Sequence, residues 1–158
     1  MDGQAPDVVI HAAAFTNVNE CETRRELAFR VNGEGTRNVA LACRKNRVPV
    51  LYISTDYVFD GEKATPYLEK DTPHPINVYG QSKLQGEDHV RALLEAFWIV
   101  RTNWLFGPLG KNFVRAMLDK AQRDGSLLSF ADSRSERLDY FLCSMRPQNA
   151  KRVQGRRS

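Results

Sequence analysis

The sequence is poor in cysteine and histidine, the residues that most often build disulfide frameworks and zinc sites. It contains three histidines and three cysteines, Cys21, Cys43 and Cys143, in 158 residues. The cysteine count is odd, and the cysteines lack the spacing of metal ligands. We therefore expect free thiols in the reducing environment of the cytoplasm, and no metal site.

Long apolar runs are also missing from the sequence. No segment approaches the roughly 20 apolar residues that a membrane-spanning helix needs. The N-terminus has no basic region followed by an apolar stretch, so no signal peptide is expected. The composition, with 42% hydrophobic and 27% charged residues, is typical of a soluble globular protein with one core.

The positive charge of the sequence is confined to its C-terminal part. Residues 131–158 carry seven basic and three acidic side chains, which accounts for the whole net charge of +4. Aromatic residues do not alternate with the basic ones at 146–158, so we expect no nucleic-acid partner. We expect a globular domain over residues 1–132 and an irregular basic tail over residues 133–158.

Apolar segments alternate with helical patterns along residues 7–130. Short apolar runs predict strands at 7–14, 48–54, 97–102 and 127–130. The intervening segments predict helices at 20–46, from the cap residue Asn77 to about residue 96, and at 112–123. This alternation predicts an α/β fold, with a Rossmann-like parallel sheet and helices on both of its faces.

Two features interrupt the regular pattern. Gly33 and Gly35 lie inside the helix expected at 20–46, and two glycines there indicate close packing or a break. Residues 56–76 form a long loop that contains Gly61 and three prolines. A loop of this length in a compact domain is usually functional.

Small and polar residues follow the ends of the predicted strands. Ligands of parallel sheets bind beyond the carboxyl ends of the strands, so residues placed there are candidates for one site. They are Ala12, Ala13, Ala14, Thr55, Asn103 and Trp104. The helix that carries Tyr79 begins at the same edge. His11, also at a strand end, is interpreted as a structural residue.

Tyr79 and Lys83 lie four residues apart and therefore share one face of the predicted helix. An ammonium beside a phenol favours the phenolate, so we expect Lys83 to lower the pKa of Tyr79 and make it a proton donor near neutrality. Thr55 can hydrogen-bond and polarise the same substrate carbonyl, and hydride would come from a nicotinamide cofactor. Taken alone, the Tyr-x-x-x-Lys spacing also fits a surface pair on an amphipathic helix.

Four segments, in this order and spacing, carry a family resemblance. They are His-Ala-Ala-Ala-Phe-Thr-Asn-Val at 11–18, Ser-Thr-Asp-Tyr-Val-Phe-Asp-Gly at 54–61, Asn-Val-Tyr-Gly-Gln-Ser-Lys at 77–83 and Arg-Thr-Asn-Trp-Leu-Phe-Gly at 101–107. Together they resemble the dTDP-4-dehydrorhamnose reductases of the extended short-chain dehydrogenase/reductase superfamily. The resemblance implies reduction of the C4 ketone of dTDP-4-dehydro-L-rhamnose to dTDP-L-rhamnose by NADPH or NADH.

The resemblance also implies roles for single residues. Tyr79 would be the proton donor, Lys83 would tune it and hold the nicotinamide ribose, and Thr55 would assist at the substrate carbonyl. The implied cofactor contacts are Ala12, Ala13, Ala14, Phe15, Thr16, Tyr79 and Lys83. The implied contacts to the nucleotide-sugar are Thr55, Asp56, Asn103 and Trp104. Other interpretations stay open, namely turn capping for Asp56 and core packing for Trp104.

The sequence departs from this family in one important respect. The Gly-x-x-Gly-x-x-Gly motif that holds the pyrophosphate does not occur. We therefore expect the first βαβ half of the sheet to be absent, and the strand at 7–14 to offer an open edge to a second copy or a partner. Two alternatives to an active reductase follow. The chain could be an inactive fragment, or a non-catalytic binding module that resembles the regulatory beta subunit of methionine adenosyltransferase.

Overall fold

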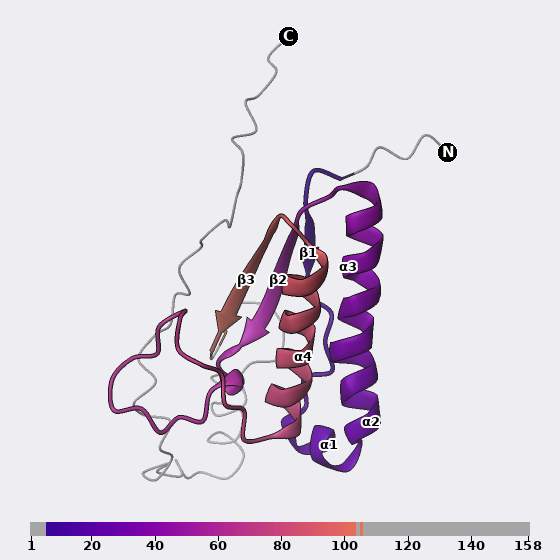
Figure 1. The fold of residues 1–158 in the computed structure, drawn as a ribbon. Helices are drawn as coiled ribbons and strands as arrows, with labels where there is room; N and C mark the ends of the chain where they lie inside the picture. The colour runs from indigo at the N-terminus through magenta and orange to yellow at the C-terminus, as the bar shows by residue number, and fades with distance from the viewer. Residues whose placement is uncertain (1–5, 104, 106–158) are drawn as a thin grey trace, which may run out of the picture.

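The computed structural model describes residues 6–103 and residue 105 (Figure 1). Within them lies one parallel sheet of three strands in the order β1-β2-β3. The strands are β1 (Val9–His11), β2 (Val50–Thr55) and β3 (Phe97–Thr102). The helix expected at 112–123, the strand expected at 127–130, the tail at 133–158 and Trp104 lie outside the described residues.

Helical segments connect the strands. Between β1 and β2 the chain forms α1 (Val18–Thr23), α2 (Arg25–Ala28), the π-helix η1 (Phe29–Glu34) and α3 (Gly35–Asn46). Between β2 and β3 it forms the short 3₁₀-helix η2 (Asp56–Val58) and then α4 (Val78–Leu93). The parallel Rossmann-like pattern predicted from the sequence is confirmed.

Helices α3 and α4 pack against each other on the same face of the sheet, as Figure 1 shows. This follows from topology, because two right-handed crossovers between consecutive strands place both helices on one side. The strands are in register, with Val50 opposite both Val9 and Phe97, and Thr55 opposite Thr102. The carboxyl ends of β2 and β3 therefore lie side by side.

The core lies between this sheet face and the two helices. Val50 and Tyr52 of β2 pack with buried residues of α3 and of the α4 end, namely Ala40, Cys43, Val90 and Leu94. Burying one apolar side chain of this size contributes about 1.5–3 kcal/mol. Alternation sends Ile10 of β1 to the other face, where 65% of it is exposed.

Strand β1 is shorter than the strand expected at 7–14. The chain leaves the sheet after His11, and the main chain of Phe15 is instead bound by the side chain of Asn32 in η1. Residues 12–16 therefore form a loop at the sheet edge rather than the end of a strand.

The helix expected at 20–46 is interrupted. Arg24 leaves helical geometry with φ −122° and ψ 48°, and the π-helix η1 begins five residues later. A Cβ on Gly33 would meet the end of the Gln85 side chain on α4, so glycine gives this close helix contact its room. Both interpretations of the glycines, a break and close packing, are confirmed.

The start of α4 is fixed by side chains from both sides. Asn77 caps it as predicted, because its Oδ1 accepts a hydrogen bond of 2.8 Å from the Gly80 N–H. Glu22 of α1 accepts a hydrogen bond of 2.8 Å from the Val78 N–H. A Cβ on Gly80 would collide with the carbonyl oxygen of Tyr57, so glycine lets the first turn of α4 approach the end of β2.

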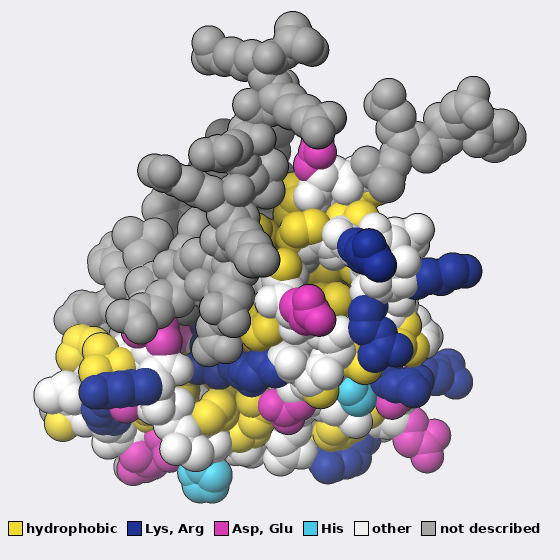
Figure 2. All heavy atoms as spheres, turned by 45° about the horizontal axis from the view of Figure 1, so that its top comes forward, with side chains coloured by type: hydrophobic (Ala, Val, Ile, Leu, Met, Phe, Trp, Pro, Cys, Tyr) yellow, Lys and Arg dark blue, Asp and Glu magenta, His cyan; other side chains and the backbone are white. Residues whose placement is uncertain are grey.

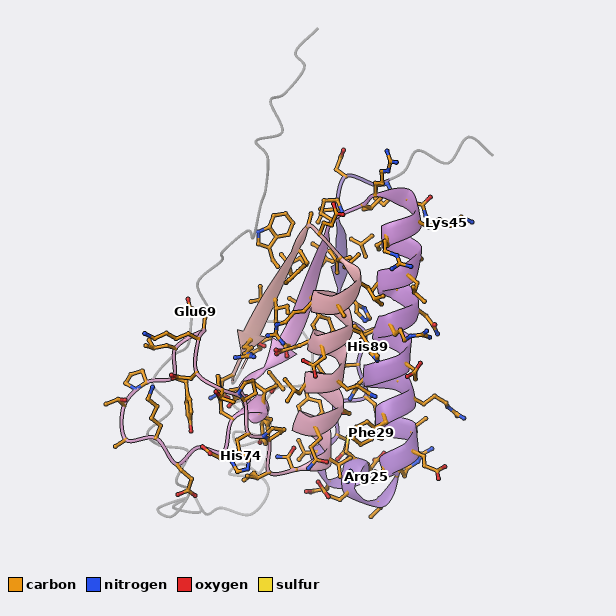
Figure 3. The ribbon with its side chains drawn as sticks, in the orientation of Figure 1. Arg25, Phe29, Lys45, Glu69, His74 and His89 are labelled. Carbon is orange, nitrogen blue, oxygen red and sulfur yellow. The ribbon has the colours of Figure 1, made fainter. Side chains whose placement is uncertain are left out.

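The outer surface of α3 is basic, with Arg37, Arg44 and Lys45 exposed. Figure 2 shows Lys and Arg side chains along the side of the molecule where α3 lies. Figure 3 shows His89 of α4 directed toward α3, and its Nε2 lies 3.9 Å from Oε1 of Glu34 at the end of η1. In the part of the chain that the structure describes, no helix combines the length and apolarity needed to cross a membrane.

Arg47 ends α3 in the left-handed region, with φ 55° and ψ 36°. Glycine adopts this geometry without the steric cost that a Cβ carries. We expect Arg47→Gly to raise the free energy of unfolding by about 0.5–1 kcal/mol, measured by urea denaturation. The control Lys45→Gly, inside α3, should lower it by about 1 kcal/mol. A loss in both variants would contradict the prediction.

Candidate active site

The hydroxyl of Thr55 lies at the carboxyl end of β2 and is buried. It donates a hydrogen bond of 3.1 Å to Asp56 Oδ1 and accepts one of 3.2 Å from the Tyr57 N–H. The strand end is also held from β3, because Thr102 Oγ1 donates to the carbonyl of Ser54 at 3.2 Å. Thr55 is thus a fixed hydroxyl at the edge where parallel sheets bind ligands.

Tyr79 lies in the first turn of α4 and is half-buried. Its hydroxyl lies close enough to the Thr55 side chain for that side chain to influence its pKa. Its ring meets that of Tyr57 edge-on, with 5.7 Å between the centroids and an interplanar angle of 73°. The structure therefore brings together Thr55 and Tyr79, the hydroxyl pair predicted from the sequence.

The expectation that Lys83 lowers the pKa of Tyr79 is wrong for this structure. Burial is the largest influence and raises the pKa of Tyr79, and the charge of Asp56 adds to the rise. The Thr55 side chain offsets part of it. Tyr79 is therefore a protonated phenol at neutral pH, which is the state that a proton donor needs.

Lys83 points past the phenol toward the sheet and is 2% exposed. Its Nζ donates a hydrogen bond of 2.7 Å to the carbonyl of Ile53 and lies 4.1 Å from the ring centroid of Tyr52. Burial lowers the pKa of Lys83 to about 8, while the negative charge of Glu87 opposes that change. Lys83 therefore remains mostly an ammonium at neutral pH.

Stability should depend on pH through Lys83. The pKa of Lys83 is about 8 in the folded chain against an ordinary value of 10.5, so between these values the unfolded state binds more protons and stability rises with pH. From about pH 7 to about pH 9.5, the wild type should gain about 2 kcal/mol of unfolding free energy relative to Lys83→Met. Denaturant titrations across this range test it, and parallel curves for the two proteins would contradict it.

The loop after β1 carries the five residues expected to contact a cofactor. Ala12, Ala13 and Thr16 are exposed, whereas Ala14 and Phe15 are half-buried. Phe15 packs into the same cluster as Tyr79. The loop therefore lies next to the cluster that Tyr79 packs against.

Asn32 ties this loop to α4, and its role was not predicted from the sequence. Its Oδ1 accepts from the Phe15 N–H at 2.7 Å, while its Nδ2 donates to the Phe15 carbonyl at 3.0 Å and to Ser82 Oγ at 2.9 Å. Asn32 is fully buried. An asparagine beside a glycine in mid-helix was the available signal, because both are poor helix formers.

His11 is buried beside Lys83 and fits the structural role expected for it. Its Nε2 lies 3.0 Å from Thr36 Oγ1, and its ring centroid lies 5.4 Å from that of Tyr52. Burial and then the charge of Lys83 lower the pKa of His11, so the ring is neutral near pH 7. Among the described residues, no three His, Cys, Asp or Glu side chains could share a metal ion.

Two of the further residues expected to contact the nucleotide-sugar, Asp56 and Asn103, lie near the carboxyl edge of the sheet. Asp56 is half-buried next to Thr55, and burial raises the pKa of its carboxyl. Asn103 follows β3 directly and is half-buried, at the edge set by the pairing of Thr55 with Thr102. Trp104 lies outside the described residues.

Sequence comparison connects this geometry with known proteins. Residues 1–136 match the family model described as the RmlD substrate binding domain. The chain is 44% identical over 128 residues to a dTDP-4-dehydrorhamnose reductase of Sinorhizobium fredii, covering 81% of this chain and 43% of that protein. It is 42% identical over 132 residues to the enzyme of the same name from Aggregatibacter actinomycetemcomitans, covering 84% of this chain and 45% of that protein.

Structural comparison gives the same result. The crystal structure of dTDP-4-dehydrorhamnose reductase from Bacillus anthracis in complex with NADP superposes with a TM-score of 0.72 at 45% identity, covering 74% of this chain and 42% of that one. The chain thus spans less than half the length of these relatives. By its sequence match and its fold, this chain belongs to the RmlD substrate binding domain family.

Proposed function

We propose that this chain contributes the proton-donating half of a carbonyl reductase that reduces dTDP-4-dehydro-L-rhamnose at C4 with a nicotinamide cofactor. The observation that carries the proposal is that the Tyr79 phenol lies close enough to the fixed hydroxyl of Thr55 for Thr55 to influence the pKa of Tyr79. Two hydroxyls converge there on one point at the carboxyl edge of the sheet. A substrate carbonyl oxygen placed between them would accept two hydrogen bonds and then a proton.

The two hydroxyls have different tasks. Tyr79 is protonated at neutral pH and can donate its proton to the carbonyl oxygen as negative charge develops on it. The Tyr57 N–H fixes the position of the Thr55 oxygen. The single hydroxyl proton of Thr55, which is donated to Asp56 in this structure, would turn to the carbonyl oxygen when a substrate binds. Lys83 binds the Ile53 carbonyl next to this strand end, and we propose that its ammonium holds the ribose of the cofactor.

The residues at the end of β1 fit a nicotinamide cofactor. Ala12 and Ala13 are exposed, and their single methyl groups allow a ligand to approach the main chain closely. Phe15 is held rigidly by Asn32 on one side of this approach. When bound there, NADPH or NADH would supply the hydride, since side chains do not provide one. Support for NADPH comes from the NADP complex of the Bacillus anthracis relative.

The substrate is assigned from the names of the relatives. The proteins from Sinorhizobium fredii and Aggregatibacter actinomycetemcomitans are named dTDP-4-dehydrorhamnose reductases. Asp56 and Asn103 are the described residues that we propose contact the nucleotide-sugar, and Thr55 would contact its carbonyl. We place the reaction in the cytoplasm, in keeping with the free thiols of Cys21 and Cys43.

We also propose that β1 can pair with a second copy of the chain or with a partner. Among the described residues, β1 pairs with β2 alone, so its other edge presents unpaired main-chain groups. Light scattering of the purified chain tests this. Pairing predicts a dimer or larger assembly, and a monomer at all concentrations would contradict it.

A calorimetric titration of the purified chain with NADPH, followed by a turnover assay, tests the proposed function. The assay follows oxidation of NADPH in the presence of dTDP-4-dehydro-L-rhamnose. Saturable NADPH binding that Lys83→Ala weakens, together with turnover, would support it. Binding without turnover would favour a regulatory binding module, and a folded chain that binds no NADPH would contradict the cofactor assignment.

A further inference from the structure

A buried carboxylate lies between α4 and the sheet and has no part in the chemistry described above. Glu87 has no exposed surface, and it lies one helical turn after Lys83 on the same face of α4. An ionised carboxylate in such a place is costly unless charged partners and hydrogen bonds satisfy it. Its partners therefore indicate what it does.

Three side chains donate hydrogen bonds to Glu87. Arg101 of β3 binds it with both Nε at 2.9 Å and Nη2 at 2.7 Å, Ser54 Oγ donates at 2.6 Å, and Arg91 Nη2 donates at 2.7 Å. Burial opposes ionisation, but Arg101 and then Ser54 and Arg91 outweigh it and hold the pKa of Glu87 below its ordinary value. Glu87 is therefore a fixed negative charge at neutral pH.

The Glu87 carboxylate holds Arg101, and Arg101 in turn contacts the long loop after β2. The guanidinium carbon of Arg101 lies 4.8 Å from the ring centroid of Phe59. The Phe59 ring stacks on that of Tyr67, with centroids 4.1 Å apart and an interplanar angle of 12°. Without Glu87, Arg101 would lose both hydrogen bonds that aim it at this aromatic pair.

Through Ser54 and its own charge, Glu87 reaches the reacting groups. Ser54 directly precedes Thr55, so the bond from its hydroxyl to Glu87 fixes the end of β2. The titratable and charged groups around Lys83 and Glu87 are His11 from β1, Tyr52 from β2, Arg101 from β3, and Tyr79 and Arg91 from α4. His11 is neutral and both tyrosines are protonated near pH 7, which leaves Glu87 as the anion that acts on Lys83.

We propose that Glu87 is a positioning residue for carbonyl reduction. Its carboxylate is the counter-charge that keeps Lys83 cationic, and through Ser54 and Arg101 it fixes the end of β2 and the Phe59–Tyr67 pair of the loop that follows. That Glu87 assists carbonyl reduction rests on the proposed function. The effect of the Glu87 charge on the protonation of Lys83 does not, because it can be measured in a chain without turnover.

The test is the pH dependence of acetylation at Lys83. The full chain is pulsed with acetic anhydride at a series of pH values, and modification is quantified by mass spectrometry. Lys45, which Figure 3 shows directed outward from α3, is the internal reference. The midpoint is the pH at which Lys83 reacts at half its maximal rate. In Glu87→Gln this midpoint should fall by about one pH unit, because a neighbouring opposite charge is lost. The exposed neighbour Asp88 gives the matched control, and Asp88→Asn should leave the midpoint in place.

The direction of the shift separates this role from a merely structural one. If Glu87→Gln only loosened the interior, water would reach Lys83 and move its midpoint up toward the ordinary lysine pKa of about 10.4. Glu87→Asp keeps the charge and should restore the wild-type midpoint. Where Glu87→Gln does not fold, the double variant Glu87→Gln/Arg101→Gln removes both partners of the Arg101–Glu87 ion pair, so no buried guanidinium is left without its carboxylate, and it should also give a lower midpoint.

An unchanged or raised midpoint in the folded variants would overturn the proposal. In a chain that turns over, Glu87→Gln should lower kcat about tenfold and move the alkaline limb of its pH profile down by the same unit. If the midpoint falls in a chain that never turns over, the effect of the Glu87 charge on Lys83 is supported. Only the proposed function is then contradicted.

Discussion

Tyr79→Phe is expected to lower kcat for carbonyl reduction about 10³-fold while the Kd for NADPH changes less than about threefold. The substitution removes the proton donor beside Thr55 but keeps the ring against Tyr57 and Phe15. Steady-state kinetics and calorimetry on the same preparation measure the two quantities separately.

Tyr67→Phe is the matched control for this prediction. It removes one phenolic hydroxyl, which binds Asp60, and it keeps the ring that stacks on Phe59. Its kcat should stay within about threefold of the wild type. Equal losses in both variants would show that the effect comes from packing and would contradict the role assigned to Tyr79.

Asn32→Asp is expected to lower the free energy of unfolding by about 2–4 kcal/mol. The aspartate can still accept from the Phe15 N–H, but it cannot donate to the Phe15 carbonyl or to Ser82. The variant also places a carboxylate in a fully buried position. Urea denaturation near neutral pH measures the loss.

Asn38→Asp makes the same chemical change at an exposed position of α3 and should change stability by less than about 0.5 kcal/mol. Because the Asn32 variant loosens the loop that carries Ala12 to Thr16, we also expect it to weaken NADPH binding. A loss of stability equal to that of Asn38→Asp would contradict the role assigned to Asn32.

The parts of the fold that rest on local signals could be predicted from the sequence. Val50–Thr55 and Phe97–Thr102 are apolar runs, and Asn77 carries the cap of α4 in its own side chain. Tyr79 and Lys83 share a helix face because their spacing requires it. Their position next to Thr55 follows from the rule that parallel strands present ligand sites at their carboxyl ends.

The remaining features depend on contacts between distant segments. The break before α3 is stabilised by Asn32, whose partners Phe15 and Ser82 lie 17 and 50 residues away. Glu87 looks like an exposed helical carboxylate until Arg101 arrives from β3. The direction of Lys83 toward the Ile53 carbonyl likewise has no sequence pattern.

The close approach of Gly80 to the Tyr57 carbonyl has a consequence for how this site can vary. The main chain of Gly80 lies against the main chain of Tyr57, without a side chain between them. This contact sets how far the hydroxyl of Tyr79 lies from that of Thr55. Core positions such as Val50 or Val90 can therefore change in size over evolutionary time while the spacing of the hydroxyls is kept. Any residue larger than glycine at position 80 would instead move the whole catalytic helix outward, so variation there is tied to loss of the reaction.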